Sequence, residues 1–151
     1  MQKFRHSFIV ESPIERVWHL YTDIKHLEMI TPKGIELKII CTTDQNITQG
    51  QEIWVSGKIF GKMRRRIKWH SKITFLKPHE YIDEMLSGPF KRWRHLHRFH
   101  SIEGKHTEII DEVEVELPYG IIGKLFERYT CKQLQNIFEY RKIATIKALE
   151  Q

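Results

Sequence analysis

The 151-residue sequence predicts an α+β domain in which a curved antiparallel sheet of about seven strands wraps around a long C-terminal helix. Three observations predict this class. Short alternating segments joined by polar turns fill residues 35–117, a helical pattern with one apolar stripe covers Pro118–Leu149, and two short helical segments follow the first strand. Short connections favour antiparallel neighbours, and an apolar helical stripe has to be buried against another layer. We therefore expect one domain spanning residues 1–151.

The N-terminal segment predicts a strand followed by two short helices. Apolar and polar residues alternate over Lys3–Glu11, as in a half-buried strand. Ser12-Pro13 predicts a helix start, because serine caps helices and proline suits the first helical position, and Glu15 would complete a capping box. Thr22-Asp23 predicts the start of a second short helix. That helix should end before Pro32, because the residue preceding proline avoids the α region.

Four further β-rich segments precede the longest hairpin. They cover Ile35–Cys41, Glu52–Phe60, a basic stretch that starts at Lys62 and breaks at Lys77-Pro78, and Tyr81–Leu86. In the basic stretch, most cations alternate with apolar residues. Because side chains of a strand point to opposite faces in turn, this pattern indicates a solvated outer face over a buried inner face.

The longest β-rich stretch, Gly88–Pro118, predicts two long strands that turn through Glu103-Gly104-Lys105. Glycine supplies the positive φ that a short hairpin loop requires. A three-residue loop there fixes the register of the inner face, which pairs Phe99 with Ile109, His97 with Asp111, His95 with Val113 and Trp93 with Val115. The outer face supports this register, because it pairs opposite charges: Arg92 with Glu116, Arg94 with Glu114 and His100 with Glu108.

His95, His97 and Asp111 are the polar residues that this register sends to the inner face. Buried polar groups require hydrogen-bond partners, so one reading is structural: Asp111 accepts from His97 and stiffens the hairpin. A second reading has a histidine orient a ligand carbonyl or hydroxyl, and a third makes one histidine a general base held by Asp111. The three residues could also ligate a metal, but Asp111 is already engaged in the predicted pairing, so we expect none.

Large apolar residues supply candidate walls for an internal cavity. We expect seven of them to contact a ligand or fill the core: Trp54, Trp69, Trp93, Ile122, Phe126, Tyr129 and Ile137. The face to which Trp54 points depends on whether its strand keeps a regular alternation, because Gly57 could mark a bulge. Arg141 lies in the apolar stripe of the long helix. We expect its side chain to snorkel to the surface. The alternatives are that it pairs with an acidic residue or binds a ligand carboxylate.

The formal net charge of +6 raises the possibility of nucleic-acid binding. No RNA- or DNA-binding motif accompanies the charge, so we expect no nucleic-acid partner. No apolar run approaches the ~20 residues of a membrane span, and the N-terminus lacks the apolar core of a signal peptide. Two cysteines without metal-ligand spacing fit a reduced compartment, so the sequence predicts a cytoplasmic protein that is not embedded in a membrane.

The predicted order is one strand, two short helices, six strands and a long helix, which is a helix-grip arrangement. This order and several strings resemble the START/Bet v 1-like superfamily, also called the SRPBCC or polyketide-cyclase-like superfamily. The strings are SPIERVWHLYTDIKHLEMITP (Ser12–Pro32), GPFKRWRHLHRF (Gly88–Phe99), the spaced Thr107, Asp111 and Val113 with ELPYG, and IFEYR (Ile137–Arg141). Within it, the chain resembles small single-domain bacterial proteins labelled cyclase/dehydrase. The resemblance implies a deep apolar cavity between sheet and helix, but not one chemistry.

These observations predict binding of a small hydrophobic or amphipathic molecule in an internal cavity, with a transport role as one form of it. The first alternative is an enzyme of the cyclase, dehydratase or hydrolase type that uses an inward His–Asp pair. The second is an adaptor with a packed core, whose basic face docks on an acidic partner. We expect no cofactor, and a monomer or a homodimer; enzyme activity is the weaker expectation.

Overall fold

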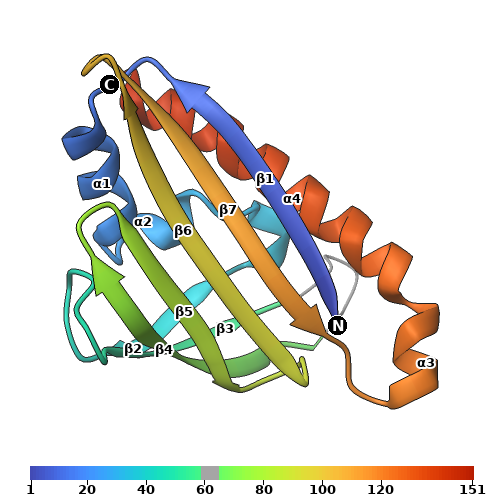
Figure 1. Cartoon of the computed structure of the whole chain (residues 1–151). Helices are drawn as coiled ribbons and strands as arrows, with labels where there is room; N and C mark the ends of the chain where they lie inside the picture. The colour runs from blue at the N-terminus through green and yellow to red at the C-terminus, as the bar shows by residue number, and fades with distance from the viewer. Residues whose placement is uncertain (59–64) are drawn as a thin grey trace.

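The computed structural model describes residues 1–58 and 65–151, which form one antiparallel sheet with helices against it (Figure 1). The strand order is β1-β7-β6-β5-β4-β3-β2. The strands are β1 (Gln2–Val10), β2 (Lys38–Thr42), β3 (Glu52–Gly57), β4 (Ile67–Lys77), β5 (Glu80–Ser87), β6 (Arg92–Ile102) and β7 (His106–Glu116). The helices are α1 (Ile14–Thr22), α2 (His26–Met29), a 3-10 turn η1 (Lys33–Ile35), α3 (Gly120–Leu125) and α4 (Glu127–Leu149). The predicted helix-grip fold is confirmed.

The core lies between the inner face of the sheet and the helices α1 and α4. Phe8 of β1, Val17 of α1 and Phe99 of β6 belong to one buried cluster. A second cluster joins Val113 of β7 to Phe138 of α4. Full burial of one such side chain stabilises the fold by about 1.5–3 kcal/mol. Figure 1 shows α4 running along the sheet beside β1, so the sheet and this helix enclose the interior between them.

The predicted register of the β6–β7 hairpin is confirmed. His97 pairs with Asp111, His95 with Val113, and the predicted outer-face pairs are also direct neighbours. The loop comprises Glu103-Gly104-Lys105, and both Glu103 (φ 52°) and Gly104 (φ 70°) have left-handed backbone conformations. Glycine tolerates this conformation because it has no Cβ atom.

The C-terminal helix differs from the prediction, because it is two helices instead of one. Tyr119 (φ 71°) and Gly120 (φ 53°) take left-handed conformations after β7, and α3 then ends at Phe126, where α4 begins. A Cβ atom on Gly123 would come within 2.5 Å of the Pro118 carbonyl oxygen, so only glycine fits that close approach. The break leaves α4 with 23 residues, or roughly 34 Å at 1.5 Å per residue.

Smaller differences occur near the N-terminus. Helix α1 begins at Ile14 without a side-chain cap, and the Ser12 hydroxyl has no hydrogen-bond partner within the described ranges. Glu15, predicted to complete a capping box, instead contacts His79, with Oε1 and Nε2 2.7 Å apart. The predicted strand Ile35–Cys41 starts later, at Lys38, because η1 and the left-handed Glu36 (φ 48°) precede it.

The β3–β4 region is shorter than predicted. Strand β3 ends at Gly57 and β4 begins at Ile67, so Arg65 and Arg66 lie before the strand. The predicted strand residues 59–60 and 62–64 lie outside the described residues. Within residues 1–58 and 65–151, no helix combines the length and apolarity of a membrane span.

Candidate ligand-binding site

A cavity of about 220 Å³ lies between the sheet and the helices. Most of its lining is apolar and comes from α1, α4, the segment around α2 and the strands β3, β4 and β6: Leu20, Ile24, Ile30, Ile53, Val55, Trp69, Ile73, Trp93, Leu134 and Ile137. Four polar lining residues, Asp83, His95, His97 and Arg141, lie together on one part of the wall, and the polar lining also includes Asp23, Thr31 and Ser71. The cavity therefore has the composition of a small-molecule site, which is mostly apolar with a few polar groups.

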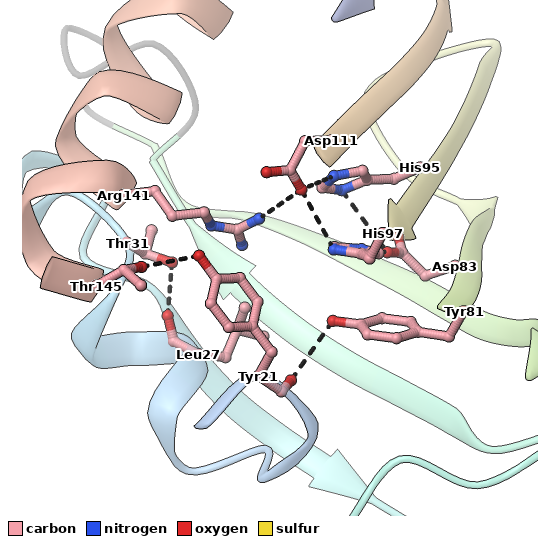
Figure 2. A network of polar contacts seen from close by, with 10 residues as sticks. All are labelled: Tyr21, Leu27, Thr31, Tyr81, Asp83, His95, His97, Asp111, Arg141 and Thr145. Carbon is pink, nitrogen blue, oxygen red and sulfur yellow. Dashed lines mark hydrogen bonds and ion pairs between the residues drawn. The ribbon is translucent and has the colours of Figure 1, made fainter. Parts of the chain in front are cut away.

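Three neighbouring strands and α4 build this polar wall (Figure 2). Asp83 of β5 pairs with His95 of β6, and His97 pairs with Asp111 of β7. Because side chains alternate along each strand, these four residues share the inner face and form two adjacent rows. Arg141 reaches the same place from α4. We call these five residues the polar wall.

Each histidine contacts both carboxylates, at different distances. His95 Nε2 lies 2.8 Å from Asp111 Oδ1, and His97 Nε2 lies 2.6 Å from Asp83 Oδ2. The crossed contacts are longer, at 3.4 Å between His97 Nδ1 and Asp111 Oδ1 and 3.7 Å between His95 Nδ1 and Asp83 Oδ2. The predicted His97–Asp111 hydrogen bond is thus corrected. Asp111 pairs first with His95, because His97 turns its nearer nitrogen to Asp83.

The pKa values of the two buried histidines shift in opposite directions. Burial, and after it the positive charge of His97, lower the pKa of His95 to about 4, so His95 is neutral at pH 7. Burial also acts to lower the pKa of His97, but its contacts with Asp111 and Asp83 outweigh burial and raise that pKa. A neutral His95 that donates from Nε2 to Asp111 carries its lone pair on Nδ1.

The charges of the polar wall balance when His97 is protonated. Burial acts to raise the pKa of both carboxyl groups, yet the histidine contacts and Arg141 hold the pKa of Asp83 and Asp111 below its usual range. Two carboxylates then face one imidazolium and one guanidinium. The net charge of the polar wall is zero, which limits the cost of burying four ions together.

Arg141 is buried instead of snorkelling, which corrects the default prediction. It is 9% exposed, and its Nη1 lies 3.6 Å from Asp111 Oδ1, too far for a good hydrogen bond. Its Nε and Nη1 atoms have no hydrogen-bond partner within the described ranges. The guanidinium also lies over the rings of Phe138 and Tyr21, with centroid distances of 5.4 and 5.9 Å. It is a buried cation that lines the cavity with unused donors.

Two tyrosines border the polar wall. The Tyr81 ring stacks on His97 at a centroid distance of 4.1 Å, and its hydroxyl donates to the Tyr21 carbonyl oxygen at 3.4 Å. The Tyr21 hydroxyl forms a 2.8 Å hydrogen bond with Thr145 of α4. Burial raises the pKa of both tyrosines, so their hydroxyls remain neutral. Figure 2 shows both rings close to the polar wall.

The predicted site residues divide into two groups. Trp69, Trp93, His95, His97 and Ile137 line the cavity, and Asp111 is buried in contact with both histidines without lining the cavity itself. The remaining four do not line it: Trp54, Ile122, Phe126 and Tyr129.

The four misplaced residues have two structural causes. On β3, the inward positions belong to Ile53 and Val55, so Trp54 faces outward and stacks on His70 at 4.2 Å. Ile122 and Phe126 are exposed because the helix breaks at Phe126, and Tyr129 in the first turn of α4 is also exposed.

Sequence reasoning missed Asp83. Asp83 and Tyr81 are two residues apart on β5, so their side chains share one face of the strand. This alternation could have indicated that Asp83 points inward with Tyr81. Using that signal requires the β5–β6 register, and the connection between those strands includes Gly88-Pro89 without a recognisable hairpin turn.

Asp83, His95 and His97 also hold donor atoms within 4.8 Å of one another, which is a possible metal arrangement. A divalent ion there would have to displace the proton of His97, and it would lie near the positive charge of Arg141. Both effects oppose cation binding. The donor set is therefore better explained as a hydrogen-bonded network.

The fold and the site together define a helix-grip protein with an internal cavity. A family described as polyketide cyclase/dehydrase and lipid transport matches residues 10–139. The chain belongs to this family. Comparison with proteins of curated function gave no match.

Several solved structures share the fold over almost the full length. A START superfamily protein from Mycobacterium smegmatis has a TM-score of 0.75 at 12% identity, covering 99% of this chain and 97% of its own. A Thermus thermophilus protein has a TM-score of 0.73 at 20% identity, covering 98% and 97%. The Zhui aromatase/cyclase from Streptomyces sp. R1128 has a TM-score of 0.68 at 16% identity, covering 98% and 90%. At these identities, the likeness concerns the fold.

Proposed function

We propose that the protein binds a small hydrophobic or amphipathic molecule in the cavity between the sheet and α4. The observation that carries the proposal is the cavity itself. It has a volume of about 220 Å³ and a mostly apolar lining, with the polar wall at one side. An apolar ligand body would gain about 25 cal/mol for each Å² removed from water. The family description, which includes lipid transport, supports the same class of ligand.

The polar wall favours a ligand with an uncharged oxygen. Arg141 has unused N–H groups that could donate to a carbonyl or hydroxyl oxygen of a ligand. His95 Nδ1 can accept a hydrogen bond from a ligand hydroxyl. With His97 protonated the charges of the polar wall balance, so a carboxylate would bring an uncompensated buried charge. A neutral amphipathic molecule therefore fits better than an acid. We further propose that the protein is cytoplasmic, which its two free cysteines, Cys41 and Cys131, support, and that it is a monomer or a homodimer.

The first test is native mass spectrometry of the protein purified from its own host, followed by solvent extraction of whatever is bound. We expect one co-purifying neutral apolar or amphipathic compound. If the native protein is free of ligand and also fails to bind small apolar probes, the proposal is wrong.

A probe measurement tests the location. 1-Naphthol and naphthalene differ by one hydroxyl group, and both can be titrated by fluorescence. Ile137→Trp should abolish binding of both because it fills the cavity, whereas Ile143→Trp, on an exposed part of the same helix, should leave binding unchanged. Arg141 should make the wild type bind 1-naphthol more tightly than naphthalene, and Arg141→Met should remove this difference in affinity. Equal effects of the two tryptophan variants would contradict binding in this cavity.

The second candidate function is an enzyme that performs acid–base chemistry on such a molecule. The supporting observation is a neutral His95 in the cavity wall, with Nε2 2.8 Å from Asp111 Oδ1. An aromatase/cyclase and norcoclaurine synthase, whose names denote enzymes, share the fold. Once the ligand is known, His95→Gln separates the two functions, because an enzyme loses far more turnover than affinity.

The adaptor alternative has less support. It requires a packed core, but the cavity lies within it. Part of the basic face is also compensated, since Arg66 Nη2 lies 3.0 Å from Glu36 Oε2 and His70 Nε2 lies 3.2 Å from Glu52 Oε1. The cations Lys62 and Arg64 lie outside the described residues.

A further inference from the structure

Helix α3 and its flanks carry large apolar side chains that face solvent. Five of them, between 56% and 81% exposed, lie within eight consecutive residues: Tyr119, Ile121, Ile122, Leu125 and Phe126. We call these five residues the α3 patch. Isolated exposed apolar residues are ordinary, but a contiguous group of this kind usually marks an interaction site.

The backbone explains why the fold does not bury the α3 patch. The left-handed Tyr119 and Gly120 turn the chain away from β7, and the break at Phe126 ends α3 before α4 begins its packing against the sheet. Gly123, the buried residue of α3, faces the chain segment that ends β7. Figure 1 shows α3 at a corner of the molecule, outside the layer formed by α4 and the sheet. The remaining faces of α3 therefore point outward.

Exposed cations accompany the α3 patch. Lys124, Arg128 and Lys132 are exposed and form no ion pair with any residue of the described ranges. Of the two acids that flank α3 in the sequence, Glu116 pairs with Lys91 Nζ at 2.6 Å. Glu127 accepts from the neutral Gln2 amide at 2.9 Å and keeps its charge, so the three cations outnumber the one acid without a cationic partner. Arg128 and Lys132 lie four residues apart, so they share one stripe of α4. The surface around α3 is apolar at its centre and positively charged beside it.

We propose that the α3 patch docks the protein on the surface of a lipid bilayer that contains anionic lipids. Apolar and aromatic side chains enter the headgroup boundary of a bilayer, and adjacent lysines and arginines are attracted by anionic headgroups. A second copy of the chain is a poorer occupant. A two-fold symmetric interface centred on α3 would bring the same three cations of each copy close together, and like charges across an interface oppose association.

The location of the α3 patch connects it to the cavity. The Lys91 amide donates to the Glu116 carbonyl oxygen at 2.9 Å, which joins the start of β6 to the end of β7, directly before α3. Phe90 and Trp93 of that same end line the cavity. Docking through the α3 patch would thus turn this end of the cavity toward the bilayer. The docking itself does not require the proposed ligand, so the two proposals can fail separately.

Co-sedimentation with vesicles tests the docking. We expect the protein to bind vesicles of phosphatidylcholine with 30% phosphatidylglycerol, more weakly at high salt, and to bind pure phosphatidylcholine far less. Ile121→Glu with Leu125→Glu should reduce binding at least about tenfold, because both changes place a charge at the apolar boundary. Lys124→Glu with Lys132→Glu should also reduce vesicle binding roughly tenfold or more, because the pair loses its attraction to the anionic headgroups.

Matched controls exist on α4. Ile143→Glu and Lys147→Glu make the same chemical changes at exposed positions far along the helix, and should leave vesicle binding within about twofold. Circular dichroism checks that each variant is folded. The proposal is overturned if the wild type does not bind anionic vesicles, or if the control variants weaken binding as much as the α3 variants. It is also overturned if sedimentation shows a dimer that Ile121→Glu with Leu125→Glu dissociates, because the α3 patch would then be a subunit interface.

Discussion

The two faces of the β6–β7 hairpin use the same kind of pairing in different surroundings. On the outer face, Arg94 and Glu114 are cross-strand neighbours with nitrogen and oxygen 4.0 Å apart, and both are partly exposed. On the inner face, His95 and Asp111 are 2.8 Å apart and buried. Water screens the outer charges, so each outer pair contributes little. Inside, every charge needs a partner. The same two strands therefore carry a tightly coupled charge network on the inner face and a surface that tolerates substitution on the outer face.

The largest expected effect is loss of a single inner carboxylate. Asp111→Asn keeps the shape but leaves Arg141 and the protonated His97 with one negative charge fewer, and removing one partner of a buried ion network typically costs about 3–5 kcal/mol. We expect that loss in the free energy of unfolding, measured with urea. Adding Arg141→Met to Asp111→Asn should recover part of it, because the second change removes an unpaired charge. A loss below about 1 kcal/mol for Asp111→Asn would show that water solvates the polar wall.

The next effect concerns pH and separates the two inner histidines. The pKa of His95 falls from its usual 6.5 to about 4 on folding, so the unfolded chain binds the proton more readily. Stability should therefore decrease as the pH falls from 6.5 to 4, with about 3 kcal/mol at stake from this residue. His95→Gln should flatten that decrease in urea titrations at successive pH values.

His97 should give the opposite dependence. Its pKa is raised on folding, so its contribution is fully present below pH 6.5 and is lost as the pH rises through its folded-state pKa. His97→Gln should flatten the alkaline side of the stability profile. It should weaken the acidic decrease only in part, because burial, the larger cause of the lowered His95 pKa, remains when the His97 charge is removed. If both variants flattened the same side, the assignment of charges to the two histidines would be wrong.

A smaller effect is expected for a neutral hydrogen bond in the same interior. Tyr21→Phe removes the hydroxyl that bonds Thr145, which is fully buried, and leaves the threonine oxygen without this partner. The expected cost is about 1–2 kcal/mol, independent of pH between 5 and 8. Tyr140→Phe, a tyrosine on α4 that does not line the cavity, provides a matched control in thermal and urea unfolding. A pH-dependent cost would mean that Tyr21 influences the charges of the polar wall directly.

The smallest effect should come from the outer face. Glu114→Gln is the outer counterpart of Asp111→Asn, and it removes contacts of 3.5 Å with Arg92, 3.9 Å with Lys3 and 4.0 Å with Arg94. Partly exposed pairs of this kind contribute about 0.2–1 kcal/mol, and salt weakens them. We expect a loss under 1 kcal/mol in dilute buffer that disappears in 1 M salt. A loss as large as that of Asp111→Asn would refute the contrast between the two faces.

The sequence alone determined the hairpin and the residues that its inner face carries. Side-chain alternation has a period of two and the loop holds a glycine with positive φ, so residues 92–116 can be paired without knowledge of any other element. The same local reasoning identified an inward His95, His97 and Asp111, and it predicted the amphipathic helix that became α4. Local periodicity is sufficient for these features because each depends on neighbours in one strand pair or one helix.

Only the tertiary structure decided which partners these residues have. Asp83 reaches His97 through the β5–β6 register, and Arg141 reaches Asp111 from a helix 30 residues later, so neither contact follows from a local pattern. The helix break at Phe126 was equally hidden, because the apolar spacing continues across it while backbone conformations at Tyr119 and Gly120 redirect the chain. Long-range packing sets the charge of each buried histidine and the exposure of α3, because both depend on which distant groups exclude or admit water.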